Sequence, residues 1–200
     1  LTLAAQAAHV AEYAERLRRG PVWLLGHSMG GAIVMMLADE RPELVAGIIN
    51  VEGNLTLKDA FWSSRIIRKN PAEWAEEYGA MLTDISATLR RWGIDPTPQR
   101  IRWMGHVLRN QPPKTVYAMS EALVAETQPP EYLEAVQRVV NRGRPLHLIA
   151  GEKSAGAWDV PEFVRAGAES YTKQRNVGHL MMLEEPDEFC HIINRLLPTA

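Results

Sequence analysis

The sequence predicts an α/β protein whose mostly parallel sheet is interrupted by a long helical insertion. Short apolar runs at 22–25, 45–51 and 145–150 alternate with helical periodicity, which is typical of buried parallel strands joined by helices. Between 55 and 141 no clear strand pattern occurs, and proline pairs separate several short helical segments. A stretch of roughly 85 residues is far longer than an ordinary loop, so we expect it to form a cap over a site.

The first elements follow in the order helix, strand, helix, strand. Leu3, Ala7, Val10, Ala14 and Leu17 recur at spacings of three and four, which predicts a helix that stops at Gly-Pro (20–21). The apolar run 22–25 is then a buried strand, and a second helix runs from position 28 to before a proline at 42. The strand at 45–51 completes a βαβ unit, whose crossover is expected to be right-handed.

The βαβ pattern returns after the insertion. We expect a strand at 145–150, a helix at 160–169, a polar-edged strand at 171–177 and an amphipathic helix at 186–197. The predicted division is an α/β core in two parts, with the insertion between them. It comprises residues 1–54 as the first part of the core, 55–141 as an all-helical cap, and 142–200 as the second part of the core.

Composition excludes several classes of function. The chain has 200 residues, 46% hydrophobic and 23% charged, and a formal net charge of −2, so nothing marks it for nucleic acid or an anionic membrane. A single cysteine, Cys190, allows neither an intrachain disulfide nor a thiolate metal cluster. No apolar run approaches the length of a membrane span, and the first residues lack the layout of a signal peptide. Cytoplasm is the default expectation for its location.

The sharpest local signal is Gly-His-Ser-Met-Gly at 26–30, which fits the pattern G-x-S-x-G. The bare pattern is weak, but here an apolar strand precedes it and an Ala/Val/Met-rich helix follows it. Such a turn holds Ser28 in a strained conformation that projects its hydroxyl, and Gly26 and Gly30 leave room for the backbone. At the helix N-terminus, the Met29 N–H can point at a developing oxyanion. The alternative is a glycine-rich turn whose serine only caps the helix.

A serine nucleophile needs a base at neutral pH, and the chain has six histidines. His179 follows the last predicted strand and precedes the last helix, and the loops at the carboxyl ends of strands build the sites of open α/β sheets. His27 adjoins the nucleophile, but we expect its side chain to point away, and His147 lies inside a strand. We therefore predict that His179 is the base.

These two motifs resemble those of the α/β-hydrolase superfamily. Gly-His-Ser-Met-Gly-Gly (26–31) is similar to its nucleophile elbow, and Gly-His-Leu-Met-Met-Leu-Glu-Glu-Pro-Asp-Glu-Phe (178–189) is similar to its terminal histidine segment. The insertion stands where the family carries its cap, and the resemblance covers nearly the whole chain. It implies a hydrolase of esters, thioesters or amides that needs no metal and no organic cofactor.

The resemblance also implies a carboxylate that orients the histidine. The commonest family position follows the strand at 145–150 in the pattern Gly-x-x-Asp, but here Ser154 stands where the aspartate is expected. A second position, at the end of the preceding strand, is similar to that of some haloalkane dehalogenases, and Glu52 stands there. We favour Glu52, with Asp159 as the next choice and Glu152 after it. Glu52 could instead be a solvated or turn-capping carboxylate, and dehalogenase chemistry is not expected because the nucleophile is Ser28.

Four family strands that usually precede the first helix, and the second oxyanion donor near them, have no counterpart here. We therefore expect a fragment of a longer protein with one bare edge on the strand at 22–25, weak or no activity by itself and poor solubility.

The predicted reaction is hydrolysis of a small, apolar acyl substrate by Ser28, His179 and Glu52, with the Met29 N–H at the oxyanion. The alternatives are a non-hydrolytic ligand-binding protein on the same scaffold, or an acyltransferase or carbon–carbon bond hydrolase with the same triad. The large apolar residues of the insertion form either its own core or a substrate wall, and its arginines form either a solvated face or an anion site. Neither the substrate nor the oligomeric state follows from the sequence.

Overall fold

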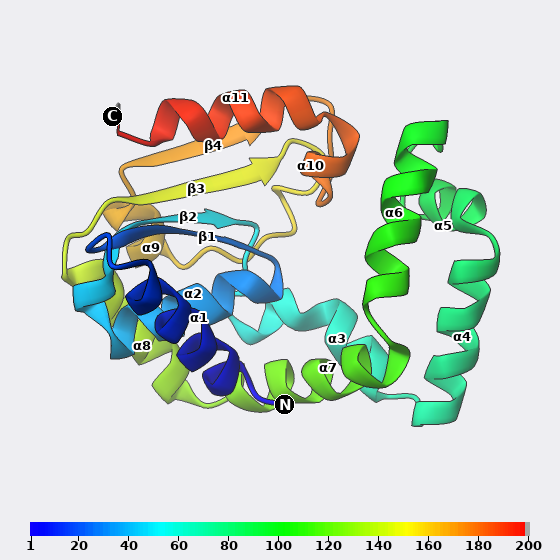
Figure 1. The fold of residues 1–200 in the computed structure, drawn as a ribbon, viewed down its shortest axis with the longest axis horizontal. Helices are drawn as coiled ribbons and strands as arrows, with labels where there is room; N and C mark the ends of the chain where they lie inside the picture. The colour runs from blue at the N-terminus through cyan, green and yellow to red at the C-terminus, as the bar shows by residue number, and fades with distance from the viewer. Residues whose placement is uncertain (199–200) are drawn as a thin grey trace.

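The computed structural model describes residues 1–198, and its centre is one sheet of four parallel strands in the order β1-β2-β3-β4 (Figure 1). The strands are β1 (Val22–His27), β2 (Val45–Val51), β3 (Leu146–Gly151) and β4 (Ser170–Gln174). The predicted α/β fold with a mostly parallel sheet is confirmed. In the described residues β1 pairs along one edge only, because no strand lies beyond it in the sheet.

Helices cover both faces of the sheet, which explains why its strands read as continuous apolar runs. On one face lie α1 (Leu3–Leu17), α2 (Met29–Glu40), α8 (Pro130–Asn141) and α9 (Glu162–Gly167), and on the other lie α10 (Met181–Glu184) and α11 (Pro186–Leu196) (Figure 1). Every residue of β3 is buried. The edge strand β4 is mostly half-buried and ends at Gln174, three residues before the predicted end, because its polar residues give no apolar boundary.

Thr2 caps the N-terminus of α1, and its Oγ1 accepts a hydrogen bond from the Ala5 N–H at 3.0 Å. Its buried face is Leu3, Ala7, Ala11 and Ala14. Val10 is half-buried, and Leu17 is 42% exposed, so the predicted stripe is wrong at its far end. The helix ends at Leu17, because the next residue, Arg18, has a left-handed backbone with φ 50°. No further turn follows that could return an apolar side chain to the core.

Every regular element described between β2 and β3 is helical. After a 3₁₀ turn, η2 (Leu57–Ala60), come α3 (Phe61–Ile67), α4 (Pro71–Thr83), α5 (Ile85–Arg91), α6 (Pro98–Asn110), α7 (Pro113–Thr127) and α8. Proline occupies the first position of four of these helices, where its missing N–H costs nothing, so the predicted breakers are helix starts. The division of the chain at 54/55 and 141/142 stays a prediction.

We call residues 61–127, which form α3 to α7, the inserted helices. Helices α4, α5 and α6 stand beyond the carboxyl ends of the strands, and α3 and α7 connect them to the rest (Figure 1). They have their own apolar cluster, built around the fully buried Trp74 and Tyr78. Two members of this cluster, Leu183 and the partly buried Leu180, come from the segment after His179.

None of the helices in residues 1–198 combines the length and the apolar character that crossing a lipid bilayer requires.

Candidate active site

The loops that follow the four strands meet at one edge of the sheet, as expected for the carboxyl ends of parallel strands. Backbone hydrogen bonds join them in pairs. Ser28 N donates to Val51 O at 3.1 Å, and Asn54 N donates to Ser28 O at 3.0 Å. Lys153 N donates to Val177 O at 3.0 Å. The turn after β1 is therefore tied to the end of β2, and the loop after β3 is tied to the loop that carries the predicted base.

Ser28 occupies the turn between β1 and α2 with φ 53° and ψ −124°, a conformation that non-glycine residues rarely adopt. The strain predicted for a nucleophile turn is therefore present. Although Ser28 stands at the N-cap position of α2, its side chain makes no capping hydrogen bond. The missing capping bond gives no support to the alternative in which Ser28 only caps the helix. The Ser28 hydroxyl is not engaged in capping α2.

Two glycines make the turn possible, and one of them differs from the expectation. A Cβ on Gly26 would lie 2.4 Å from the carbonyl oxygen of Gly30, so only glycine fits there. A Cβ on Gly30 would meet nothing within 4 Å, so the expectation that this glycine provides packing room is wrong. Gly31 provides it instead, because its Cβ would lie 2.3 Å from the Cα of Gly53 after β2. The close approach packs α2 against the β2 loop.

Glu52 and His179 form a direct pair. Glu52 Oε2 lies 2.6 Å from His179 Nδ1, although 127 positions separate the two residues. The other oxygen, Oε1, accepts hydrogen bonds from the Gly151 N–H at 2.8 Å and from the Ser154 hydroxyl at 2.6 Å. The Glu52 side chain is 4% exposed and that of His179 is 39% exposed. A buried carboxylate thus holds one imidazole nitrogen and leaves Nε2 for other partners.

The environment of Glu52 favours its charged form. Burial by itself raises the pKa of this carboxyl, but the hydrogen bonds from His179 and Ser154 outweigh burial and lower the pKa below its ordinary value. Its backbone has a positive φ of 39°, unusual for a glutamate. Strained backbone at the end of a strand is common where a side chain must be aimed at a site.

The other two candidate acids are engaged elsewhere in the described residues. Asp159 Oδ2 accepts a hydrogen bond from the Thr56 hydroxyl at 2.7 Å, and its Oδ1 lies 3.4 Å from Lys58 Nζ. Glu152 Oε2 accepts a hydrogen bond from the Asn176 N–H at 2.9 Å. The structure therefore brings Glu52 to His179, whereas Asp159 joins the loop before the inserted helices to the loop after β3.

His27, which was expected to point away from Ser28, reaches the base loop. Its Nε2 lies 2.9 Å from the carbonyl oxygen of His179, and the two imidazole rings are 4.5 Å apart between centroids. This contact is absent from the sequence prediction. Strand alternation could have indicated it, because His27 shares a face of β1 with Trp23, opposite Leu24 and Gly26.

No hydrogen bond joins Ser28 Oγ to His179 Nε2 in residues 1–198. Such a bond is often long in a ligand-free enzyme and shortens when substrate binds. Met29 is the first residue of α2, so its N–H has no acceptor within the helix and carries the positive end of the helix dipole. The turn thus presents a hydroxyl and an N–H donor side by side.

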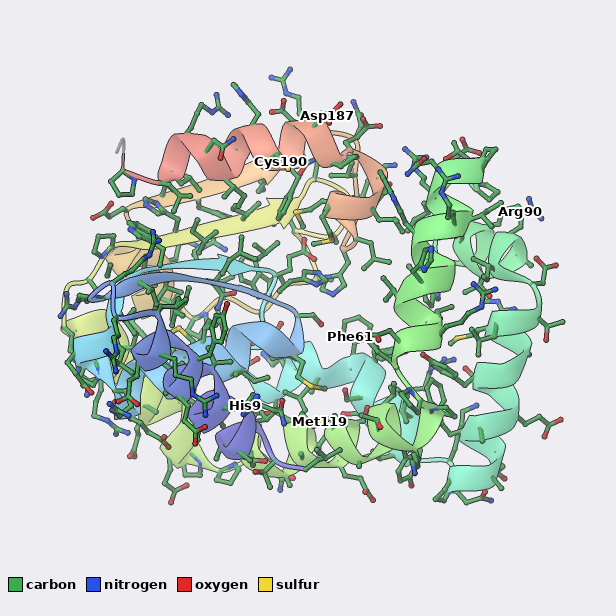
Figure 2. The ribbon with its side chains drawn as sticks, in the orientation of Figure 1. His9, Phe61, Arg90, Met119, Asp187 and Cys190 are labelled. Carbon is green, nitrogen blue, oxygen red and sulfur yellow. The ribbon has the colours of Figure 1, made fainter. Side chains whose placement is uncertain are left out.

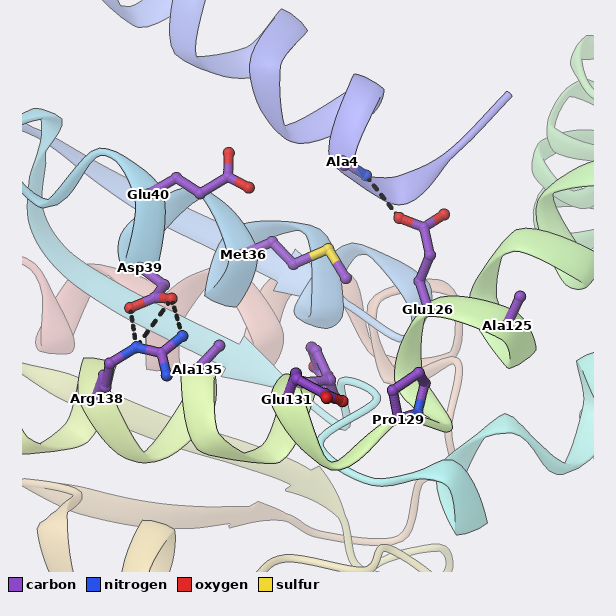
Figure 3. A pocket seen from close by; sticks show the side chains of 11 residues that line it. Ala4, Met36, Asp39, Glu40, Ala125, Glu126, Pro129, Glu131, Ala135 and Arg138 are labelled. Carbon is purple, nitrogen blue, oxygen red and sulfur yellow. Dashed lines mark hydrogen bonds and ion pairs between the residues drawn. The ribbon is translucent and has the colours of Figure 1, made fainter.

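The described residues hold no group of three or more histidine, cysteine or acidic side chains arranged for a metal ion. A groove of about 620 Å³ lies between α1, α2, α7 and α8, lined in part by Met36, Glu126 and the Asp39–Arg138 ion pair (Figure 3). None of its lining residues belongs to the candidate site, so it does not supply the reaction centre.

Several large apolar residues of the insertion form its own core, as the simpler of the two expectations held. Trp74, Met81 and Met104 are buried in the cluster of the inserted helices. Phe61 is 67% exposed and Trp103 is 38% exposed. Figure 2 shows Phe61 on α3, between the strand ends and α6 in this view.

Some of the basic residues of the insertion form ion pairs with neighbouring acidic side chains. Arg65 and Lys69 both pair with Glu77, and Arg100 Nη2 donates to the Glu184 carbonyl oxygen at 2.5 Å. These contacts are those of a structural surface, and the last one ties α6 to the segment after His179.

Comparison with known proteins gives one matching family and many solved structures with a related fold. The profile described as the alpha/beta hydrolase family matches residues 1–192. No curated protein sequence matches the chain.

Three solved structures illustrate the likeness. A carboxylesterase from the ammonia-oxidizing thaumarchaeon Nitrososphaera gargenis has 18% identity and a TM-score of 0.70, over 98% of this chain and 71% of that one. A thermophilic esterase from Thermogutta terrifontis has 22% identity and a TM-score of 0.67 over the same shares. Est816, described as an N-acyl homoserine lactone degrading enzyme, has 19% identity and a TM-score of 0.65, over 98% of this chain and 75% of that one. At such identities the likeness shows the fold.

Proposed function

Since the chain belongs to the alpha/beta hydrolase family and is a hydrolase, we propose that it is a serine hydrolase acting on a carboxylic ester or related acyl bond. In this proposal Ser28 is the nucleophile, His179 the general base and Glu52 the acid that orients it. The observation that carries it is the 2.6 Å contact between Glu52 Oε2 and His179 Nδ1, beside the strained turn of Ser28. Family membership alone leaves the reaction open, because one fold hosts many activities.

Acylation begins when His179 Nε2 takes the proton of the Ser28 hydroxyl as Oγ attacks the carbonyl carbon of the substrate. The Met29 N–H stabilises the oxyanion of the tetrahedral intermediate. When the intermediate collapses, the carbon–oxygen bond to the leaving group breaks, and His179 gives its proton to the departing oxygen. An alcohol leaves, and the acyl group remains on Ser28.

Deacylation repeats these steps with water. His179 takes a proton from the water as its oxygen attacks the acyl carbon, and then returns that proton to Ser28 Oγ as the ester bond breaks. A carboxylic acid leaves, and the free serine is restored. Glu52 stays ionised throughout and stabilises the imidazolium, which agrees with the hydrogen bonds that lower its pKa.

Two features support a small, apolar acyl substrate. The esterases named above share the fold, and the inserted helices stand over the strand ends with exposed apolar residues such as Phe61. An apolar wall suits the binding of an acyl chain.

The test is covalent labelling with a fluorophosphonate probe. The purified chain should be labelled at Ser28 even though its turnover is expected to be weak, and Ser28→Ala should lose labelling and at least about 1,000-fold of any esterase rate. Ser86→Ala, on α5, is the matched control and should label like the parent protein. Labelling that persists in Ser28→Ala would contradict the assignment, and a folded parent protein that does not label would favour the ligand-binding alternative.

A further inference from the structure

The His27 side chain belongs to the Gly-His-Ser-Met-Gly motif but has no part in the mechanism above. It is the last residue of β1, and it precedes the nucleophile directly. Its Nε2 lies 2.9 Å from the carbonyl oxygen of His179, 152 positions away. The rings of the two histidines also pack against each other, tilted by 39°. One side chain therefore contacts both the backbone and the imidazole of the predicted base.

The charge state of His27 sets the direction of this hydrogen bond. Burial, followed by the neighbouring His179, lowers the pKa of His27 from 6.5 to about 4. At neutral pH the ring is therefore uncharged and has one N–H. Because a carbonyl oxygen can only accept, that N–H is on Nε2 and donates to His179 O. A neutral donor holds the base without adding a positive charge next to it, and Glu52 is the charged group facing the pair.

We propose that His27 is a positioning residue that holds the main chain and ring of His179 in the orientation needed to reach Ser28. The inference rests on the serine hydrolase function proposed above. Glu52 holds His179 at Nδ1, and His27 holds it at the carbonyl oxygen, so the residue is held once at its ring and once at its main chain. The contact also couples the two halves of the site, because the same short turn carries the nucleophile and the group that places the base.

Two variants separate the hydrogen bond from the space that the ring fills. His27→Phe keeps a ring of similar size but has no donor, whereas His27→Gln keeps a neutral N–H donor at a similar reach. The matched control is His147→Phe, because His147 is also a buried imidazole in the sheet, hydrogen-bonded to Ser170 at 2.9 Å, and it lies near the start of β3, at the opposite end of the strand from the site loops.

The kinetic readouts are the rate of fluorophosphonate labelling and the separate kcat and KM for p-nitrophenyl butyrate. In His27→Phe, labelling and kcat should fall about 10- to 100-fold, as expected for a misplaced catalytic group, while KM changes by less than about twofold. His27→Gln should recover most of the loss. His147→Phe should lower the melting temperature without lowering kcat. Equal kcat in His27→Phe and the parent protein, or equal losses in His27→Phe and His147→Phe, would overturn the proposal.

A measurement that needs no turnover separates this inference from the proposed function. The proton shared by His179 Nδ1 and Glu52 should give a low-field NMR resonance, which His27→Phe should broaden or shift and His147→Phe should leave in place. If the parent protein does not label at Ser28, the serine hydrolase function fails. The resonance still tests whether His27 positions His179. An unchanged resonance in His27→Phe would show that His27 does not position the base.

Discussion

The strand-end site and the inserted helices hold their side chains by opposite means. At the site, the buried Glu52 carboxylate has a hydrogen-bond donor for each oxygen: His179 for one, Gly151 and Ser154 for the other. In the inserted helices an apolar cluster around Trp74 is buried, and charged groups pair near the surface, as Arg65 and Glu77 do at 2.6 Å. Removing one group at the site leaves a buried charge without its partner, whereas removing one from the helices leaves a cavity. The first change should affect chemistry, and the second should affect stability.

The largest expected effect is that of Glu52→Gln at the site. The amide keeps the shape and can still accept from Gly151 and Ser154, but it no longer stabilises an imidazolium or selects the right tautomer of His179. We expect kcat to fall about 1,000- to 10,000-fold with little change in the melting temperature. Steady-state kinetics and thermal unfolding check this expectation.

The control for that change is Asp159→Asn, which removes the next candidate acid. It should keep kcat within about threefold and lower only stability, through its contacts with Thr56 and Lys58. Loss of activity in Asp159→Asn with retention in Glu52→Gln would reverse the assignment of the acid.

Trp74→Ala is the matching change in the inserted helices. Trp74 is fully buried, and its indole N–H donates to Pro113 O at 2.9 Å, so truncation should lower the free energy of unfolding by about 3–5 kcal/mol. Ser28 should still be labelled below the unfolding transition. Phe61→Ala, at a position that is 67% exposed, should change stability by less than about 0.5 kcal/mol. Equal destabilisation by the two variants would show that the buried cluster around Trp74 is not what stabilises the inserted helices.

His27 should contribute to the pH dependence of stability. Burial, followed by the charge of His179, lowers the pKa of His27 from 6.5 to about 4. The unfolded chain therefore takes up a proton near pH 6.5, while the folded chain does so only near pH 4. Stability is full above pH 6.5 and falls by up to about 3 kcal/mol as the pH drops to 4.

Urea unfolding at pH 7 and pH 4 measures that loss. His27→Phe should show a flatter profile over this window, because position 27 then carries no group that titrates there. The lowered pKa of Glu52 acts at lower pH, since its stabilisation is present above 4.5 and is lost below that value. Parallel profiles for His27→Phe and the parent protein would contradict the assignment.

Of the changes at the site, Ser154→Ala should have the smallest effect. It removes one hydrogen bond to Glu52 Oε1 and leaves the Gly151 N–H in place. A hydrogen bond to a charged group is worth about 1.5–3 kcal/mol, and the lower end of that range corresponds to a fall in kcat of about tenfold. Ser154→Thr keeps a hydroxyl and should retain activity. A rate in Ser154→Ala equal to that of the parent protein would show that the backbone N–H alone suffices to place Glu52.

Much of the sheet could be predicted, because its central strands are buried on both faces. The predicted strand at 45–51 matches β2, and that at 145–150 is shifted by one residue from β3. β4 was harder to delimit, since its half-buried polar residues carry neither alternation nor a continuous apolar run. The short helix α10 has four residues, too few for helical periodicity to register.

The site was predictable in residue types more than in contacts. Ser28 and His179 lie in recognisable local motifs, so the chain alone suggests them. The pairing of Glu52 with His179 joins residues 127 positions apart, and no spacing along the chain encodes it. The prediction of Glu52 as the acid rested instead on a family resemblance and on the presence of Ser154 where the aspartate is expected. That this serine donates to Glu52 follows only from the way β2 and β3 lie side by side.

The apolar cluster of the inserted helices includes Leu180 and Leu183, which follow the predicted base directly. A chimera that exchanges only residues 61–127 for the helices of another hydrolase would leave those two leucines behind, facing a surface for which they were not selected. The inserted helices and the segment that carries the predicted base therefore share one apolar cluster and are not independent units in this chain. A cap exchange intended to alter specificity has to carry residues 180–183 with it, or to choose donor helices that already accommodate two leucines at that point.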